Sequence, residues 1–220
     1  MLDPRVLSDE PHVEDAMRAA GFELDPANGQ PGAWINPDGI PVDLMVPDAL
    51  GGVGRRGARV PPHSKHALRK ATGLEAVVVD HRVMDVSALT ADDPRVYTIN
   101  VASPAALLVA KLHKLGDRQG HATRLEDKDA HDIYRLLTAL PSEQFSSLRW
   151  LSSDALAGDV TRRALRLLQR LFASGPDAVG SQMAGRAEEG IGDRDVVAAS
   201  VAALAGDVLA LLNEHDSPPE

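Results

Sequence analysis

Cysteine is absent from this 220-residue sequence, which excludes disulfides, thiolate zinc sites and cysteine nucleophiles. Aromatic residues make up only 3% of the chain, so a core must be built from Leu, Val and Ala, a composition that favours helices. No apolar run comes close to the roughly 20 residues of a membrane-spanning helix. The N-terminus M-L-D-P-R also lacks the charged-then-apolar layout of a signal peptide. We therefore expect a cytoplasmic protein with no membrane partner.

Charge is plentiful and unevenly placed. The net charge of −9 argues against a protein that binds nucleic acid over its whole surface. Positive charge is nevertheless concentrated between residues 55 and 70, in Arg55, Arg56, Arg59, Lys65, Arg69 and Lys70. Such a segment can contact the phosphates of tRNA, of other RNA or of a nucleotide. A plain loop, solvated or paired with the surplus acids, is an equally good interpretation.

The first half of the chain has the pattern of an α/β unit. An amphipathic helix is predicted over about 9–20, followed by a hairpin over 32–47 whose turn is Asn36-Pro37-Asp38-Gly39. Further along, glycine spacing and β-prone runs predict a short helix and then three strands, at residues 63–71, 75–80, 82–86 and 96–101.

After residue 101 the pattern becomes helical. Ser103-Pro104 is a strong helix start, and the helix is predicted to run to about 118. Its buried stripe is Leu108, Leu112 and Leu115, beside a cationic stripe of Lys111, Lys114 and Arg118. Later helices are predicted at about 124–140, 142–156, 159–173 and 194–213, with a flexible connection over 174–193. We expect two domains, an α/β core over 1–101 and a helical region over 102–220.

Two groups of residues could carry chemistry. Lys128, Asp129 and Asp132 share one helix face, and with the cations of the preceding helix they could present a mixed cluster to one cleft, which suits phosphate chemistry. An ordinary solvated helix start explains the same spacing and is favoured on spacing alone. Asp43 is an acid in an otherwise apolar strand. It would be a metal ligand or general base if its face lines a cleft, and unremarkable if that face is open to solvent.

Three segments in this order resemble a known family: P-V-D-L-M-V-P at 41–47, S-P-A-A-L-L-V-A-K-L-H-K-L-G-D-R at 103–118, and K-D-A-H-D-I-Y-R-L-L at 128–137. They are similar to nucleotidyltransferase-like proteins related to the AbiEii type IV toxins, over roughly residues 10–140. The resemblance implies an α+β fold, with a polymerase-beta-like core of a small mixed sheet and helices, followed by a helical bundle. It also implies transfer of a nucleotidyl group from a nucleoside triphosphate to RNA or protein, in a toxin–antitoxin system with a cognate antitoxin.

The same resemblance assigns roles to individual residues. It implies catalytic roles for Asp43, Lys128 and Asp132, with Asp43 also as a ligand of Mg²⁺. It implies contacts to the nucleotide, mainly its phosphates, for Lys111, Lys114, Arg118 and Asp129. Independently of the resemblance, the basic segment makes Arg55, Arg56 and Arg59 candidates for contacts with RNA.

One departure from the family pattern concerns the metal site. The family's Gly-Ser motif and its Asp-x-Asp pair should precede the first helix, and residues 1–9 contain neither. We therefore expect either an N-terminally incomplete core or a divergent member without the metal pair. Because paired acids hold the ions in two-metal transfer, we expect weak nucleotide binding and poor turnover. The alternative is a non-catalytic binding module of the same fold.

Overall fold

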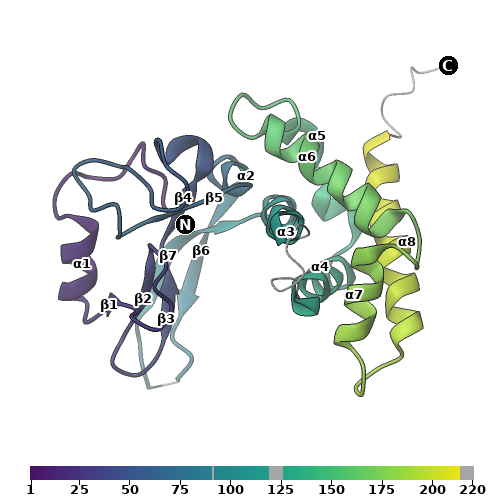
Figure 1. Ribbon diagram of the computed structural model, residues 1–220, viewed down its shortest axis with the longest axis horizontal. Helices are drawn as coiled ribbons and strands as arrows, with labels where there is room; N and C mark the ends of the chain where they lie inside the picture. Colours follow the sequence, from purple (N-terminus) through teal and green to yellow (C-terminus); the bar gives the residue numbers. More distant parts are fainter. Residues whose placement is uncertain (91, 119–125, 214–220) are drawn as a thin grey trace.

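The computed structural model describes residues 1–90, 92–118 and 126–213. It confirms a mixed α+β protein, 47% helical and 14% strand. Figure 1 shows strands gathered in an N-terminal lobe and helices in a second lobe, with α3 (Pro104–Arg118) as the helix of that lobe nearest the strands. The chain therefore has two lobes, and α3 lies on the side of the helical lobe that faces the strands.

The N-terminal lobe holds short elements joined by ordered loops. In chain order these are α1 (Val13–Ala19), β1 (Glu23–Leu24), β2 (Ala33–Ile35), β3 (Pro41–Asp43), β4 (Met45–Pro47), the 3-10 turn η1 (Asp48–Leu50), β5 (Arg69–Ala71) and α2 (Leu74–Val79). Strands β1, β2 and β3 form an antiparallel sheet, and β4 pairs with β5 in parallel.

The predicted hairpin is present, but its second strand serves two sheets. Ala33 pairs with Asp43 in β3, and the chain then leaves this sheet at Leu44. The Leu44 N–H donates to the Gly32 carbonyl at 2.7 Å, after which Met45 pairs with Arg69. A Cβ on Gly32 would lie 2.3 Å from the Leu44 carbonyl oxygen, so this crossing requires glycine. The handover places Asp43 at the end of its strand.

Two predictions in the N-terminal half are wrong. Residues 63–71 form turns and then strand β5 instead of a helix, because the backbone of Arg69 to Ala71 completes the ladder with β4. Residues 74–79 form helix α2 instead of a strand. Glu75, buried inside this valine-rich run, accepts hydrogen bonds from the Gly73 and Ala49 N–H groups at 2.8 and 2.9 Å. Tertiary packing here overrides β propensity.

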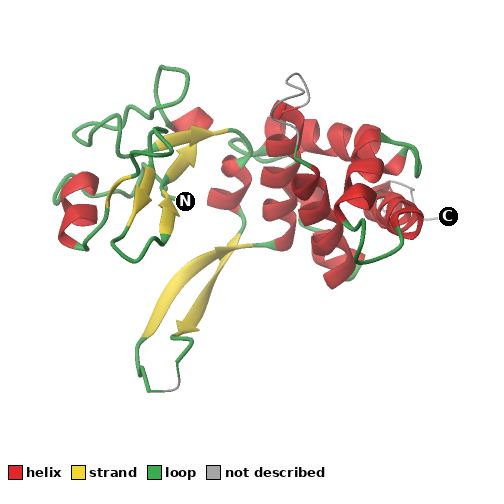
Figure 2. Cartoon of the chain, turned by 60° about the horizontal axis from the view of Figure 1, so that its bottom comes forward, coloured by secondary structure: helices red, strands yellow, loops and turns green. Residues whose placement is uncertain are grey.

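A long hairpin links the two lobes. Strands β6 (His81–Ser87) and β7 (Val96–Ala102) pair antiparallel, as the sequence predicts, and Figure 2 shows the pair extending away from both lobes. Met84 lies opposite Ile99 and Val86 opposite Tyr97, so one face of the ribbon is apolar. All seven residues of β6 are exposed.

The described residues of the second lobe form helices and the turns that join them. After α3 come α4 (Asp127–Ala139), the 3-10 turn η3 (Ser142–Phe145), α5 (Leu148–Leu151), α6 (Gly158–Leu168), the π-helical η4 (Gln169–Ala173), α7 (Val179–Ala187) and α8 (Arg194–Asn213). Residues 119–125, which include the first two of the segment predicted to start the second helix, lie outside the described residues. The predicted Ser103 cap is confirmed, since its hydroxyl accepts from the Ala106 N–H at 3.1 Å.

Two other helix predictions need correction. Residues 142–156 form only the short η3 and α5, and the segment predicted as a flexible connection contains helix α7, whose inner face is buried. Small residues permit this packing: a Cβ on Gly180 would lie 2.7 Å from the Leu171 carbonyl oxygen. A glycine-rich composition thus marks a close helix contact in this segment, in place of the predicted linker.

Each lobe has its own hydrophobic core. Val13, Trp34, Val46 and Leu68 fill the N-terminal lobe, and the Trp34 indole donates to the Ala67 carbonyl at 3.0 Å. The larger core lies among the helices and includes the predicted stripe Leu108, Leu112 and Leu115. Ala76 and Val77 of α2 join this second core. Helix α2 therefore fixes one lobe against the other.

Helix α8 shows that the prediction of no apolar run near membrane length is wrong. By length and composition alone it could cross a membrane, with a mean hydropathy of 1.9, and 33% of that window is buried. Its buried residues Val197, Val201, Ala205 and Val208 belong to the helical core. The expectation of a cytoplasmic protein without a membrane partner stays a prediction.

Candidate functional site

A cleft lies between α3 and the strand ends of the N-terminal lobe. Its cavity of about 590 Å³ is lined by seven cationic side chains and three carboxylates, in a chain whose net charge is −9. The cations are Arg55, Arg56, Arg69, Lys70, Lys111, Lys114 and Arg118, and the acids are Asp43, Asp48 and Asp117. A cavity of about 340 Å³ elsewhere, between α4, η3 and α8, is lined by one charged side chain, Asp207. Charge thus distinguishes the first cavity as a site for an anion.

Helix α3 supplies one wall of the cleft. Leu107, Lys111, Lys114 and Arg118 recur at spacings of three and four, which places them on one face of a helix. Leu108 and its neighbours on the other stripe are buried. The amphipathic pattern therefore turns the cationic stripe toward the N-terminal lobe. Arg118 ends the helix, where the macrodipole stabilises positive charge.

Two carboxylates of α4 form ion pairs with the three cations of α3. The Lys114 ammonium lies 2.7 Å from Asp129 Oδ1, and Arg118 Nη1 donates to Asp129 Oδ2 at 2.5 Å. The Asp129 side chain is only 2% exposed. Oδ1 accepts no aligned hydrogen bond within the described part of the chain, so its contact with Lys114 is mainly electrostatic. One buried carboxylate thus fixes two cations of the cleft.

Asp132 holds Lys111, the third cation of α3, in the same way. The Lys111 ammonium donates to Asp132 Oδ2 at 2.9 Å. Partial burial acts to raise the pKa of Asp132, but the hydrogen bond and charge of Lys111 outweigh it, so this pKa lies below its usual range. Asp132 is therefore ionised at neutral pH and holds Lys111 against α4.

The opposite wall comes from the strand ends. Arg69 Nη2 lies 3.0 Å from Asp43 Oδ2, and the Lys70 ammonium lies 3.0 Å from Asp48 Oδ1. Lys70 also donates to the carbonyls of Gly52 and Gly54, at 2.8 and 3.1 Å. Its side chain is only 8% exposed. Lys70 therefore ties down the glycine-rich loop, and Arg69 neutralises Asp43.

The predicted basic segment divides into two parts. Arg55 and Arg56 are exposed and line the cavity, and Arg56 Nη1 donates to Gln30 Oε1 at 3.3 Å. Arg59 is exposed but does not line the cavity. The anchored loop therefore adds two guanidinium groups to the cleft.

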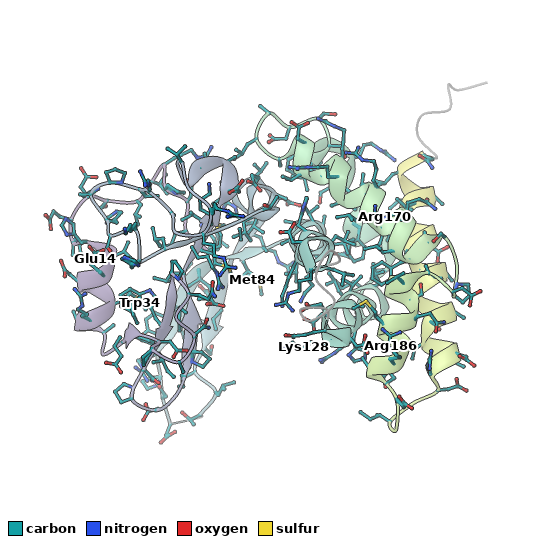
Figure 3. The ribbon with its side chains drawn as sticks, in the orientation of Figure 1. Glu14, Trp34, Met84, Lys128, Arg170 and Arg186 are labelled. Atoms are coloured by element: carbon teal, nitrogen blue, oxygen red, sulfur yellow. The ribbon has the colours of Figure 1, made fainter. Side chains whose placement is uncertain are left out.

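The charged motif of α4 lies where the sequence did not place it. None of Lys128, Asp129 and Asp132 lines the cavity. Lys128 is 73% exposed and pairs with Glu126 at 2.8 Å instead of Asp132; Figure 3 shows it at the end of α4 nearer the N-terminal lobe. Its pKa is raised by the hydrogen bond to Glu126. The acids therefore act through the α3 cations, and the predicted catalytic role of Lys128 has no contact in the cleft.

Sequence reasoning brought together six of the cavity residues and missed others. Asp43, Lys111, Lys114, Arg118, Arg55 and Arg56 do converge. The sequence did not single out Asp48 and Asp117, and it marked Arg69 and Lys70 only as members of the basic segment over residues 55–70. Arg69 and Lys70 reach the cleft because β5 pairs in parallel with β4, a long-range pairing that no local pattern announces.

The residues present do not fit the implied magnesium site. Mg²⁺ takes near-ideal octahedral oxygen ligands, usually with carboxylates among them. Asp43 faces the Arg69 guanidinium, and the described residues contain no group of three or more His, Cys, Asp or Glu side chains that could hold a metal. The cleft is therefore a cationic site whose own side chains would contact an anion directly.

Comparisons with known proteins add no relative: no family model, no curated protein and no solved structure matches the chain. Its function must therefore be argued from the cleft itself.

Proposed function

We propose that this chain is a nucleotidyltransferase-like protein that binds a nucleoside triphosphate in the cleft between its lobes. The observation that supports the proposal is the set of seven cations lining one cavity of about 590 Å³ in an acidic protein. That volume is within the usual range for small-molecule sites. Asp43, the α3 lysines and the α4 acids also follow one another in the order of the nucleotidyltransferase-like family. That resemblance extends the proposal to a polymerase-beta-like core.

Lys111, Lys114 and Arg118 are suited to phosphate because their positions are fixed before the ligand arrives. Each already contacts a carboxylate on α4, and the three side chains remain partly exposed, at 27%, 49% and 29%. A charge-assisted hydrogen bond contributes about 1.5–3 kcal/mol. Little side-chain entropy remains to be lost on binding, since the ion pairs have already ordered these long side chains.

In the proposed transfer, a hydroxyl oxygen of an RNA or protein acceptor forms a bond to the α-phosphorus and releases its proton to water, while the bond to the pyrophosphate oxygen breaks. The cleft cations would stabilise negative charge on the departing pyrophosphate. A toxin role with a cognate antitoxin belongs to the same proposal and depends on the same resemblance.

Binding of ATP to the full chain tests the proposal directly. We expect saturable one-to-one binding by calorimetry at low ionic strength. Lys111→Ala with Lys114→Ala should weaken it at least about tenfold, because two phosphate contacts are removed. Arg163→Ala is the matched control, since Arg163 is an exposed cation of α6 that does not line the cavity. Equal affinity in all three proteins would exclude the cleft as the binding site.

The transfer itself is tested separately. Labelled triphosphates, magnesium and bulk tRNA should yield labelled tRNA or labelled protein, and the double lysine variant should not. If the chain binds ATP but yields no labelled product, the proposed nucleotide site stands and the proposed transferase activity is excluded.

A non-catalytic RNA-binding module is the second candidate, supported by Arg55, Arg56 and Arg59, which are exposed on one anchored loop. It predicts tRNA binding that weakens steeply with salt and is lost when these three arginines are neutralised. ATP affinity reduced by the double lysine variant, without salt-sensitive tRNA binding, would favour the first candidate.

A further inference from the structure

The cleft has a cationic end and an apolar end. Along α3, Leu107 and Ala110 precede Lys114 and Arg118, and the eleven helical steps from Leu107 to Arg118 span about 16 Å at 1.5 Å per residue. Leu74 of the facing wall also lines the cavity, and the neighbouring Gly73 approaches Ala110 so closely that a Cβ there would lie 3.2 Å from its Cα. Apolar surface therefore collects where the lobes touch, and charge collects toward the end of α3.

The side chains that line the cavity offer little with which to read a base. No aromatic ring is among them, and the neutral hydrogen-bonding side chains are Gln30 and Thr72. Gln30 already accepts a bond from Arg56. Asp43 and Asp48 are ion-paired with Arg69 and Lys70. Asp117, which has no ion pair among the described residues, lies beside Arg118 at the cationic end of the cleft. Bases are distinguished by placed donors and acceptors on their edges, and within the part of the chain that the structure describes the apolar end of the cleft lacks such a set.

We infer that the cleft recognises the phosphate chain of its ligand and leaves the base unread, so that it accepts the triphosphates of all four bases and inorganic tripolyphosphate alike. Lys111, Lys114 and Arg118 contact the phosphates, while the surface at Leu74 and Leu107 gives any base a similar apolar contact. The inference rests on the proposed function and specifies its substrate class.

The test compares ligands on the unmodified chain. Calorimetric titration with ATP, GTP, CTP, UTP and tripolyphosphate, at one low ionic strength without divalent ions, should give dissociation constants within about threefold, since a good bidentate base contact alone would separate them by about tenfold or more. ADP should bind about tenfold more weakly than ATP, because it lacks one charge-assisted contact. Lys114→Ala should weaken all five ligands by the same factor, and Arg163→Ala should weaken none.

Several outcomes would overturn the inference. One triphosphate binding more than about tenfold tighter than the others would show that the base is read. Nucleotides that all bind where tripolyphosphate does not would show that the apolar contact, and not the phosphate chain, carries the binding. If sulfate binds as tightly as ATP, the cleft binds anions in general and does not recognise a phosphate chain. Failure of all five ligands to bind would overturn the proposed function together with this inference, whereas a base preference leaves the proposed function intact.

Discussion

Asp129 is the residue on which the cationic wall depends. Its carboxylate is nearly inaccessible, and from helix α4 it contacts both Lys114 and Arg118. A buried charge is costly to strand without a partner, so the carboxylate and the two cations stabilise one another as a unit. A residue that does not line the cavity can in this way decide where two of its cations stand.

Replacing Asp129 with Asn should therefore destabilise the protein. We expect a loss of about 1–3 kcal/mol in the free energy of unfolding, below the value for a fully buried pair because Lys114 and Arg118 are partly exposed. Urea denaturation measures it. Asp117→Asn is the matched control: Asp117 is an exposed acid of α3 with no ion pair among the described residues, and its replacement should change stability by less than about 0.5 kcal/mol. Equal effects of the two variants would contradict a supporting role for Asp129.

The sequence predicted the spacing of the α4 motif correctly and its direction only in part. The helix predicted at about 124–140 is present as α4, and its apolar residues Ile133 and Leu137 are buried. Which charged residues turn inward depends on how α4 rotates against α3, and helical periodicity does not fix that rotation. Asp129 therefore became a buried support, and Lys128 became a solvated end of the helix.

At the scale of elements, composition misled where packing decides. The run E-A-V-V-V-D has high β propensity, yet it forms α2 because Ala76 and Val77 pack against the helical core. The one available signal was Glu75, an acid inside an apolar run, which is buried and receives two backbone N–H groups. Helix α7 was not predicted because its glycines are typical of a flexible linker. In the structure these glycines permit a close contact between helices.

Two glycines on adjacent helices give a matched test of that packing. A Cβ on Gly185 of α7 would lie 2.5 Å from the Arg194 carbonyl oxygen, so Gly185→Ala should destabilise the protein by about 1–3 kcal/mol. A Cβ on Gly206 of α8 meets no atom within 4 Å, so Gly206→Ala should stabilise it by up to about 1 kcal/mol through helix propensity. Urea midpoints of the two variants should shift in opposite directions. A stabilising Gly185→Ala would show that α7 is not packed as described.

For the whole molecule, the order of segments in the sequence predicted which segments lie together in the cleft. It did not predict the contacts that hold them there. Asp43, the α3 lysines and the basic loop are distant in the chain, and they share a cleft because α2 clamps the lobes together. The parallel pairing of β4 with β5 brought Arg69 within ion-pair distance of Asp43, the residue expected to bind Mg²⁺. Long-range pairings of this kind leave no local periodicity to read.

A ligand held by both walls should be detectable in both lobes at once. In hydrogen exchange with saturating ATP, amides of residues 51–59 and of residues 107–118 should exchange more slowly, because closed forms of the cleft are stabilised by up to about 2.7 kcal/mol at a ligand concentration one hundred times Kd. The β6–β7 hairpin does not line the cavity and should be unchanged. The Lys111→Ala with Lys114→Ala protein should lose protection in both walls, since the ligand is the link between them. Protection confined to α3 would mean that the helical lobe binds alone, and that the arginines of the facing loop serve another partner.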